Sequence, residues 1–285
     1  MFREKETAEA SIITRHSKKF KEGKGLIQSE KYPGLTEPDG VELARKTTKD
    51  ELKPMIDNLP PNAVFAILGA SEQVRTKSTS QVYGDTLAKL YKDDEQVIVK
   101  TKEMIENYPH AIERLKKDVN DNPDKKIVIN FPLFIKQFST VGKWVDNKGN
   151  YLPYTNRLLE MSGDNDDEAV INWVKTDGKI DGINGPKPLE IAQNYEKGFQ
   201  RLREFCQGQA TGRPIVVGGV GHSCDIDVFI AYLTHGKVDL ESIQKIMGKD
   251  KKMIQETELF YFETHDNKIT GRYRGKDYTL DLEKK

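Results

Sequence analysis

Short runs of hydrophobic residues, separated by longer polar stretches, predict a set of buried strands. Runs without polar alternation are typical of strands that are covered on both faces. Residues 97–99 form a weaker run, and two late runs, 258–264 and 268–273, flank a polar His265-Asp266-Asn267 and predict a hairpin. The four clearest runs are 10–14, 63–68, 126–130 and 214–220.

Helical patterns lie between these predicted strands. Residues 40–59 follow Asp39, which suits an N-cap, and Pro54 is expected to break this helix. A second helix is predicted over 78–92. In the third, 189–207, apolar residues recur every three or four positions, with Pro188 before it and Gly208 after it. Strands that alternate with helices predict an α/β fold, a three-layer sandwich with a mostly parallel central sheet and helices on both faces.

The stretch from about residue 120 to 185 has a different character. It holds scattered aromatic residues, many Gly and Asn, and an acidic run from Asp164 to Glu168. We expect an insertion within a single domain spanning 1–285. Its expected structure is a solvated loop with one or two short helices rather than part of the catalytic machinery.

Composition excludes several classes of protein. The 285 residues include 45 Lys and Arg and 45 Asp and Glu, so the formal net charge is zero and non-specific nucleic-acid binding is not expected. No apolar run approaches the length of a membrane span, and the charged first ten residues do not read as a secretory signal. Cys206 and Cys224 are too few for a disulfide scaffold. We expect a soluble cytoplasmic protein.

Histidine and arginine follow three of the predicted strands. Arg15-His16 comes after the first run, Arg75 a few residues after the run 63–68, and His222 after the run 214–220. Because ligands bind at the carboxyl ends of parallel strands, we expect these side chains to line one pocket. A cationic pocket without an acidic partner favours an anion, and phosphate suits the arginine fork best. The nearby run Lys18, Lys19, Lys21 and Lys24 either steers such an anion or is a solvated loop.

With these residues in place, the chain resembles the histidine phosphatase superfamily, which has the phosphoglycerate mutase-like fold. The resemblance covers about 12–115 and 189–280 and leaves the insertion unexplained. Four short motifs carry it, in the family's order: Thr14-Arg15-His16-Ser17, Leu35-Thr36…Gly40…Ala44, Ser71…Arg75…Thr79 and Gly221-His222-Ser223.

This resemblance implies a phosphatase that hydrolyses a phosphomonoester through a phosphohistidine on His16, with Arg15, Arg75 and His222 binding the phosphate. It implies no cofactor, and no residues have metal-ligand spacing. Cations nearby, a protonated His222 among them, are expected to lower the pKa of His16 and keep it neutral for attack. Ser17 replaces a family glycine, so it either perturbs the pocket or donates its hydroxyl to the phosphate. Mutase activity stays open.

The general acid that protonates the leaving oxygen has two candidate locations. In some members of the family it is a Glu after the third strand, which favours Glu103 here, with Glu106 as its neighbour. In others it is an Asp just after the second histidine, which points to Asp225. Asp225 equally suits an N-cap of a helix that includes 228–233.

Two other functions remain open at this point. The chain could bind a phosphorylated ligand on the same fold without turning it over. Alternatively, Gly221-His222-Ser223 resembles the nucleophile elbow of an α/β-hydrolase esterase, with Ser223 as the nucleophile, although Asp225 stands where the elbow needs a glycine. The expected partner is a small phosphorylated substrate, not nucleic acid or a membrane, and the sequence gives no indication of oligomeric state.

Overall fold

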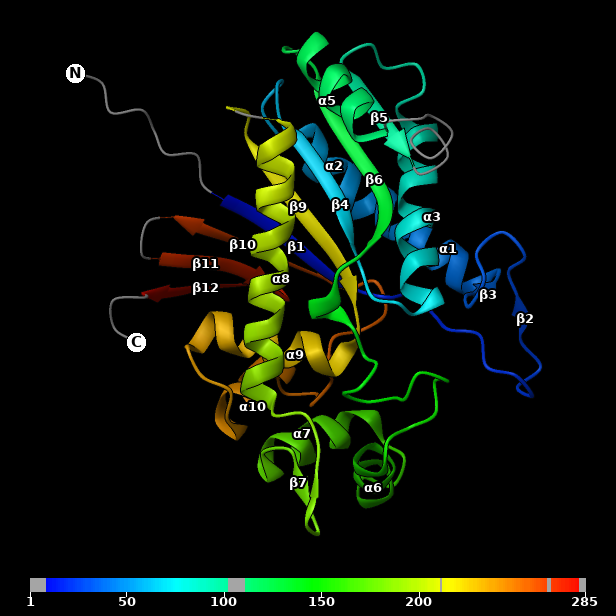
Figure 1. Cartoon of the computed structure of the whole chain (residues 1–285), viewed down its shortest axis with the longest axis vertical. Helices are drawn as coiled ribbons and strands as arrows, with labels where there is room; N and C mark the ends of the chain where they lie inside the picture. The colour runs from blue at the N-terminus through cyan, green and yellow to red at the C-terminus, as the bar shows by residue number, and fades with distance from the viewer. Residues whose placement is uncertain (1–8, 102–110, 211, 266–267, 282–285) are drawn as a thin grey trace.

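The main sheet combines a parallel half with an antiparallel extension. The computed structural model describes residues 9–101, 111–210, 212–265 and 268–281. Within them the strand order is β12-β11-β10-β1-β9-β4-β6-β5, with β5, β6, β4, β9 and β1 parallel and β10, β11 and β12 added antiparallel (Figure 1). The strands are β1 Glu9–Arg15, β4 Val64–Ala70, β5 Val97–Thr101, β6 Lys126–Phe134, β9 Ile215–Gly221, β10 Leu259–His265, β11 Lys268–Tyr273 and β12 Lys276–Asp281.

Each predicted strand run is confirmed to within a few residues, and the alternation of side chains explains why both faces are buried. In β1, Ile13 packs into one core cluster and Ile12 into the other. In β4, Ala66 and Ile67 divide between the same two clusters. Both faces therefore need a cover of helices, which gives the predicted three layers.

The two helical layers lie on opposite faces of the sheet, as Figure 1 shows. The helices α5 Ala111–Asp121, α8 Pro188–Gln209 and α9 Ser223–His235 cover one face, with α10 Leu240–Met247 packed on α9. The other face carries α1 Asp39–Thr47, a π-helical segment Thr48–Leu52, α2 Lys53–Asp57 and α3 Val74–Leu90. The three-layer α/β fold class is confirmed.

Local details of the helices differ from the expectation. Asp39 lies in the first turn of α1, after Pro38 at the N-cap. Pro54 does not interrupt the chain's helical path, because it stands in the first turn of α2, where its missing N–H costs no hydrogen bond. Helix α3 begins at Val74, earlier than predicted. Its first turn contains Arg75 and the buried Thr76 and has no apolar face, so the hydrophobic pattern did not reveal it.

The segment between β6 and α8 is a packed structure, so the expectation of a solvated loop is wrong. The core continues through α5 and β6, so this segment begins after Phe134 and not near residue 120. It contains a 3₁₀ turn Lys136–Phe138, α6 Pro153–Met161, α7 Asp166–Thr176 and the small hairpin of β7 Lys179–Ile180 with β8 Ile183–Asn184. Trp173 and Tyr154 are fully buried within it. It lies beyond the carboxyl ends of the parallel strands (Figure 1).

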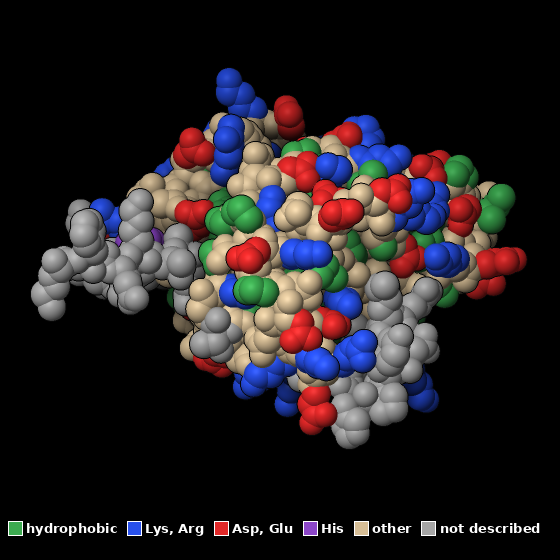
Figure 2. Space-filling view, turned by 90° about the horizontal axis from the view of Figure 1, so that it is seen from above, with side chains coloured by type: hydrophobic (Ala, Val, Ile, Leu, Met, Phe, Trp, Pro, Cys, Tyr) green, Lys and Arg blue, Asp and Glu red, His purple; other side chains and the backbone are tan. Residues whose placement is uncertain are grey.

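The surface agrees with the balanced charge of the sequence. Figure 2 shows acidic and basic side chains interspersed over one face of the molecule.

A second small sheet pairs β2 Ile27–Gln28 with β3 Thr36–Glu37 near α1. Among the helices in the described ranges, none is both long and apolar enough to cross a bilayer.

Candidate active site

The ends of β1, β4 and β9 bring three predicted residues together. His16 directly follows β1, and its backbone N–H donates to the carbonyl of Gly221 at the end of β9, 3.1 Å away. His222 comes next in the chain, and Arg75 lies in the first turn of α3, beyond β4. The two imidazole rings are 5.4 Å apart between centroids. The convergence expected from strand topology is therefore present.

Hydrogen bonds determine which nitrogen of His16 carries the proton. Its Nδ1 lies 2.7 Å from the carbonyl oxygen of Ser17, which can only accept, so Nδ1 is the protonated nitrogen. Its Nε2 accepts from Nε of Arg75 at 3.1 Å. The lone pair of Nε2 therefore points toward the guanidinium of Arg75, a type of group that binds anions.

His222 has the opposite tautomer. Its Nδ1 lies 3.2 Å from Nη2 of Arg75, and because arginine only donates, this nitrogen carries the lone pair. Its Nε2 then donates to Oγ of Ser71 at 2.8 Å. Arg75 spans both rings, and its Nη1 donates to Oε1 of Gln73 at 3.2 Å. One guanidinium therefore aligns the two histidines.

Both histidines are neutral near pH 7. Burial lowers the pKa of His16 well below 6.5, and the charge of Arg75 lowers it further, against the opposing effect of the Ser17 carbonyl. Burial and then Arg75 likewise lower the pKa of His222 well below 6.5. The expectation of a protonated His222 is therefore wrong for the free site, where the permanent charge comes from arginine and lysine.

Arg15 lies beside this pair with part of its guanidinium already engaged. Its Nη1 donates to the carbonyl of Ile254 at 2.8 Å, and its Nη2 lies 3.6 Å from the carboxylate of Glu256. Its Nε is buried and has no partner among the described residues. Arg15 lines the same cavity as the histidines, so its guanidinium contributes positive charge to that end.

Ser17 does not offer its hydroxyl to a ligand. The hydroxyl donates to the carbonyl of Gly40 at 2.6 Å, and the backbone N–H donates to Oγ1 of Thr79 at 3.0 Å. Ser17 is fully buried, and the structure does not place it on the cavity wall. We therefore correct the expected phosphate contact, because both of its donors hold the loop after β1 onto α1 and α3.

Asp225 is turned away from the cavity. Its Oδ1 accepts from Nε1 of Trp144 at 2.8 Å, and its Oδ2 from the hydroxyl of Tyr195 at 3.5 Å. It is fully buried in the first turn of α9, where the N-cap position belongs to His222, so neither the expected cap nor a contact with a leaving group is formed. Burial raises the pKa of Asp225 to about 6, although Lys143 and Trp144 favour its charged form. Glu103 and Glu106 lie outside the described residues.

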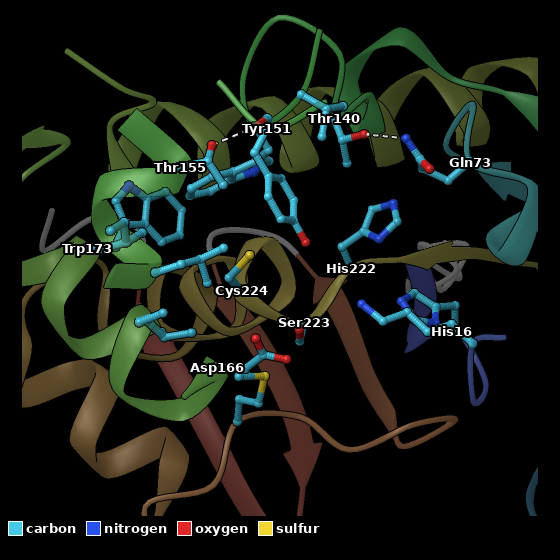
Figure 3. Close-up of a pocket in the computed structure, with 18 of the residues that line it drawn as sticks. His16, Gln73, Thr140, Tyr151, Thr155, Asp166, Trp173, His222, Ser223 and Cys224 are labelled. Carbon is cyan, nitrogen blue, oxygen red and sulfur yellow. Dashed lines mark hydrogen bonds between the residues drawn. The ribbon is translucent and has the colours of Figure 1, made fainter. Parts of the chain in front are cut away.

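A cavity of about 270 Å³ opens beside the histidines (Figure 3). One end is formed by the cationic side chains already described, together with Lys19, which belongs to the predicted lysine run. Burial lowers the pKa of Lys19, and Arg75 lowers it further. The other end is formed by the segment between β6 and α8, to none of whose residues sequence reasoning gave a role in the site: Trp144, Tyr151, Thr155, Asp166 and Trp173.

Glu72 anchors this segment to the end of β4. Its Oε1 accepts from the backbone N–H of Thr140 at 3.0 Å and from that of Val141 at 3.2 Å, and the Thr140 hydroxyl also donates to it. Gln73 adds a bond from its Nε2 to Oγ1 of Thr140 at 3.0 Å. Because Gln73 also accepts from Arg75, the first part of the segment is tied to the cationic end of the cavity.

Ser223 lines the cavity, but the arrangement of an esterase is not formed around it. A serine nucleophile needs a histidine nitrogen within hydrogen-bond reach. The ring nitrogens of His222 are bonded to Ser71 and Arg75, and those of His16 to Ser17 and Arg75. Within the described ranges, no cluster of three or more His, Cys, Asp or Glu side chains could hold a metal ion.

The chain matches no protein-family model and no curated protein, whereas solved structures do match it. They include the alpha-ribazole phosphatase from Shigella flexneri, at 14% identity and a TM-score of 0.44 over 96% of this chain and 95% of that one. A mycobacterial glucosyl-3-phosphoglycerate phosphatase matches at 13% and 0.45, over 90% and 91%. YhfR from Bacillus stearothermophilus matches at 11% and 0.47, over 94% and 97%. At such identities, function has to be argued from this chain's own side chains.

Proposed function

We propose that this chain is a histidine phosphatase, which hydrolyses a small phosphomonoester through a phosphohistidine on His16. The observation that supports it best is the state of His16: neutral, with Nδ1–H bonded to the Ser17 carbonyl and the Nε2 lone pair held beside Arg75. A nucleophile must be deprotonated and its lone pair must face the reacting group; these contacts support the first condition and direct Nε2 toward the anion-binding guanidinium.

The first step forms a bond between Nε2 of His16 and phosphorus. Nε2 supplies the electron pair, the bond from phosphorus to the ester oxygen breaks, and that oxygen leaves with the pair and takes a proton. In the second step water attacks phosphorus and gives a proton back to the group that protonated the leaving oxygen, the N–P bond breaks, and the pair returns to Nε2 as phosphate leaves. The protein mainly positions the groups and supplies fixed positive charge, which is most of what phosphoryl transfer requires.

Arg75 has to exchange partners when substrate binds. In the free site its Nε and Nη2 donate to the lone pairs of the two histidines. A phosphoryl dianion is a stronger acceptor than neutral imidazole, so we expect these donors to turn to its oxygens and free Nε2 of His16 for attack. The same dianion raises the pKa of His222, which can then donate from Nδ1 to the phosphoryl group.

The proposed phosphate-binding groups are Arg15, Arg75 and His222, with Lys19 at the rim of the same end. The general acid is still to be assigned. Glu103 remains the first choice from the family pattern, while Asp166 is the cavity-lining carboxylate among the described residues. Its exposed side chain projects from the start of α7.

The direct test is a screen of phosphorylated metabolites, run beside the His16→Ala variant. The proposal predicts release of inorganic phosphate by the wild-type protein and its loss in the variant. Tight vanadate binding without turnover of any phosphomonoester would instead indicate a phospho-ligand-binding protein on this fold. A phosphoryl group that returns to another position of the substrate would indicate a mutase.

A further inference from the structure

The end of the cavity farthest from His16 is apolar and aromatic. Figure 3 shows Trp173 and Thr155 on the side of the cavity opposite His16, with Tyr151 between them and the histidines. The wall is completed by aliphatic side chains of α6 and α7, among them Leu159 and Val170. Whatever carries the phosphate must place its organic part against this surface.

Three hydrogen-bond donors at this end, on Trp144, Trp173 and Thr155, already have protein partners. Nε1 of Trp144 donates to Asp225 at 2.8 Å, and Nε1 of Trp173 donates to the carbonyl of Pro186 at 2.6 Å. The hydroxyl of Thr155 donates to the carbonyl of Trp144 at 2.7 Å. A sugar or another polyol placed here would give up water without gaining these three donors and could bond only to the Tyr151 hydroxyl and to Asp166 at the rim, whereas an apolar group has no such bonds to lose.

The shape of this end suits a flat ring. The indoles of Trp144 and Trp173 pack edge to face, with centroids 4.7 Å apart; Trp173 is fully buried behind Trp144, which keeps 8% of its surface exposed, so the pair forms a rigid apolar backing for this end. Tyr151 is 52% exposed, so its ring can contact a guest. A cavity of about 150 Å³ is enough for benzene, so about 270 Å³ holds a phosphoryl group and one ring.

We propose that the substrate is an aromatic phosphomonoester, in which a short link joins the phosphate to a single aromatic ring. This inference rests on the proposed phosphatase function for its reaction. The phosphoryl group lies at His16 and Arg75, and the ring lies against the exposed ring of Tyr151 and the edge of Trp144. Asp166 stays hydrated at the rim, because its side chain is exposed.

The test measures binding separately from catalysis. Phosphonates cannot be hydrolysed at their C–P bond, so calorimetry can compare benzylphosphonate with methylphosphonate and 2,3-dihydroxypropylphosphonate. Burial of one ring predicts that benzylphosphonate binds about tenfold or more tightly than either of the others. Equal affinities, or tighter binding of the dihydroxypropyl compound, would overturn the inference.

Two variants locate the effect. Tyr151→Ala removes the exposed ring without creating a hole in the core, and should reduce the preference for the benzyl compound about threefold to tenfold. Tyr151→Phe is the matched control, because it keeps the ring and removes only the hydroxyl, so the preference should persist. Methylphosphonate should bind both variants as it binds the wild type. An undiminished preference in Tyr151→Ala would show that the ring binds elsewhere.

Failure of the inference and failure of the proposed function give different results. Turnover of benzyl phosphate and glycerol 3-phosphate, whose leaving alcohols are similarly basic, reports the function. Turnover of both without any preference in binding would overturn the aromatic substrate and leave the phosphatase standing. A benzyl preference in binding with no turnover of either would overturn the phosphatase and leave the aromatic ligand standing.

Discussion

Replacement of Arg75 by methionine should weaken anion binding strongly without making the free protein less stable. Arg75 is buried among cations, and the described residues place no carboxylate within ion-pair distance of it. Burial lowers its pKa, which means that the fold disfavours its charge; Tyr151 and Glu72 oppose this effect, and Arg15 adds repulsion. Methionine fills a similar volume and removes that charge. We therefore expect this charge to serve a bound anion rather than the fold, and the hydrogen bonds lost to His16, His222 and Gln73 to offset part of the gain in stability.

The size of the effect follows from the donors that would turn to phosphate. Nε and Nη2 of Arg75 now donate to the two histidines, and each hydrogen bond to a charged group contributes about 1.5–3 kcal/mol. Loss of two such bonds costs about 3 kcal/mol or more, which raises Kd roughly 100-fold. Arg75→Met should show this increase for both vanadate and inorganic phosphate.

Thermal unfolding measures both expectations at once. At a ligand concentration 100 times the wild-type Kd, binding adds about 2.7 kcal/mol to the wild type and only about 0.4 kcal/mol to a variant whose Kd is 100-fold higher. With an unfolding entropy of about 2.1 cal/mol/K per residue, the 285 residues convert these gains to Tm increases of about 4–5 °C and under 1 °C.

Lys18→Met is the matched control for loss of one positive charge. Lys18 lies near the site in sequence, but it is half exposed and faces Asp39 at 3.8 Å, outside the cavity. It should keep the full ligand-induced increase in Tm. If Arg75→Met keeps that increase too, or if its ligand-free Tm falls by several degrees, the guanidinium is a structural element and the reasoning is wrong.

Three further predictions concern pH, proton transfer and metals. Because the pKa of His16 is depressed in the fold, its contribution to stability is present above pH 6.5 and is lost as pH falls. The Tm of the wild type should therefore fall more steeply between pH 7 and 5 than the Tm of His16→Asn. Equal slopes would contradict a neutral His16. An alkyl leaving group needs a proton from the general acid, whereas a nitrophenyl group needs little protonation. Glu103→Gln should therefore slow hydrolysis of an alkyl phosphate far more than that of a nitrophenyl phosphate, and Asp225→Asn should affect both alike. The reverse pattern would identify Asp225 as the acid. Turnover should survive exhaustive chelation and be inhibited by vanadate, and rescue of a chelated, inactive protein by one divalent metal would refute this mechanism.

The sheet and the edge at which the two histidines meet could be predicted because their signals are local. Buried strands appear as uninterrupted apolar runs, and the residue that follows a parallel strand lies at the edge of the sheet whatever the rest of the chain does. This is why His16 and His222 could be placed together although 205 residues separate them. Arg75 followed from the same rule applied to β4.

The parts that failed depend on partners distant in sequence. Whether Ser17 faces the cavity is decided by the carbonyl of Gly40, and whether Asp225 does is decided by the indole of Trp144. The aromatic end of the cavity could not be read either, because Trp144 and Trp173 lie 29 residues apart in a stretch of mixed composition. Their repeated appearance in an otherwise polar segment was the available signal that this segment has a core of its own.

The central claim is a covalent phosphoryl group on Nε2 of His16, and its trapping is the most direct measurement. Wild-type protein mixed with a labelled phosphomonoester and quenched rapidly in alkali should carry a label that is stable to base and labile to acid. Peptide mapping should place it on the peptide that contains His16, and His16→Ala should lose both label and turnover, while Ser223→Ala should keep both. Normal turnover in His16→Ala, or a label that maps to Ser223, would contradict the account.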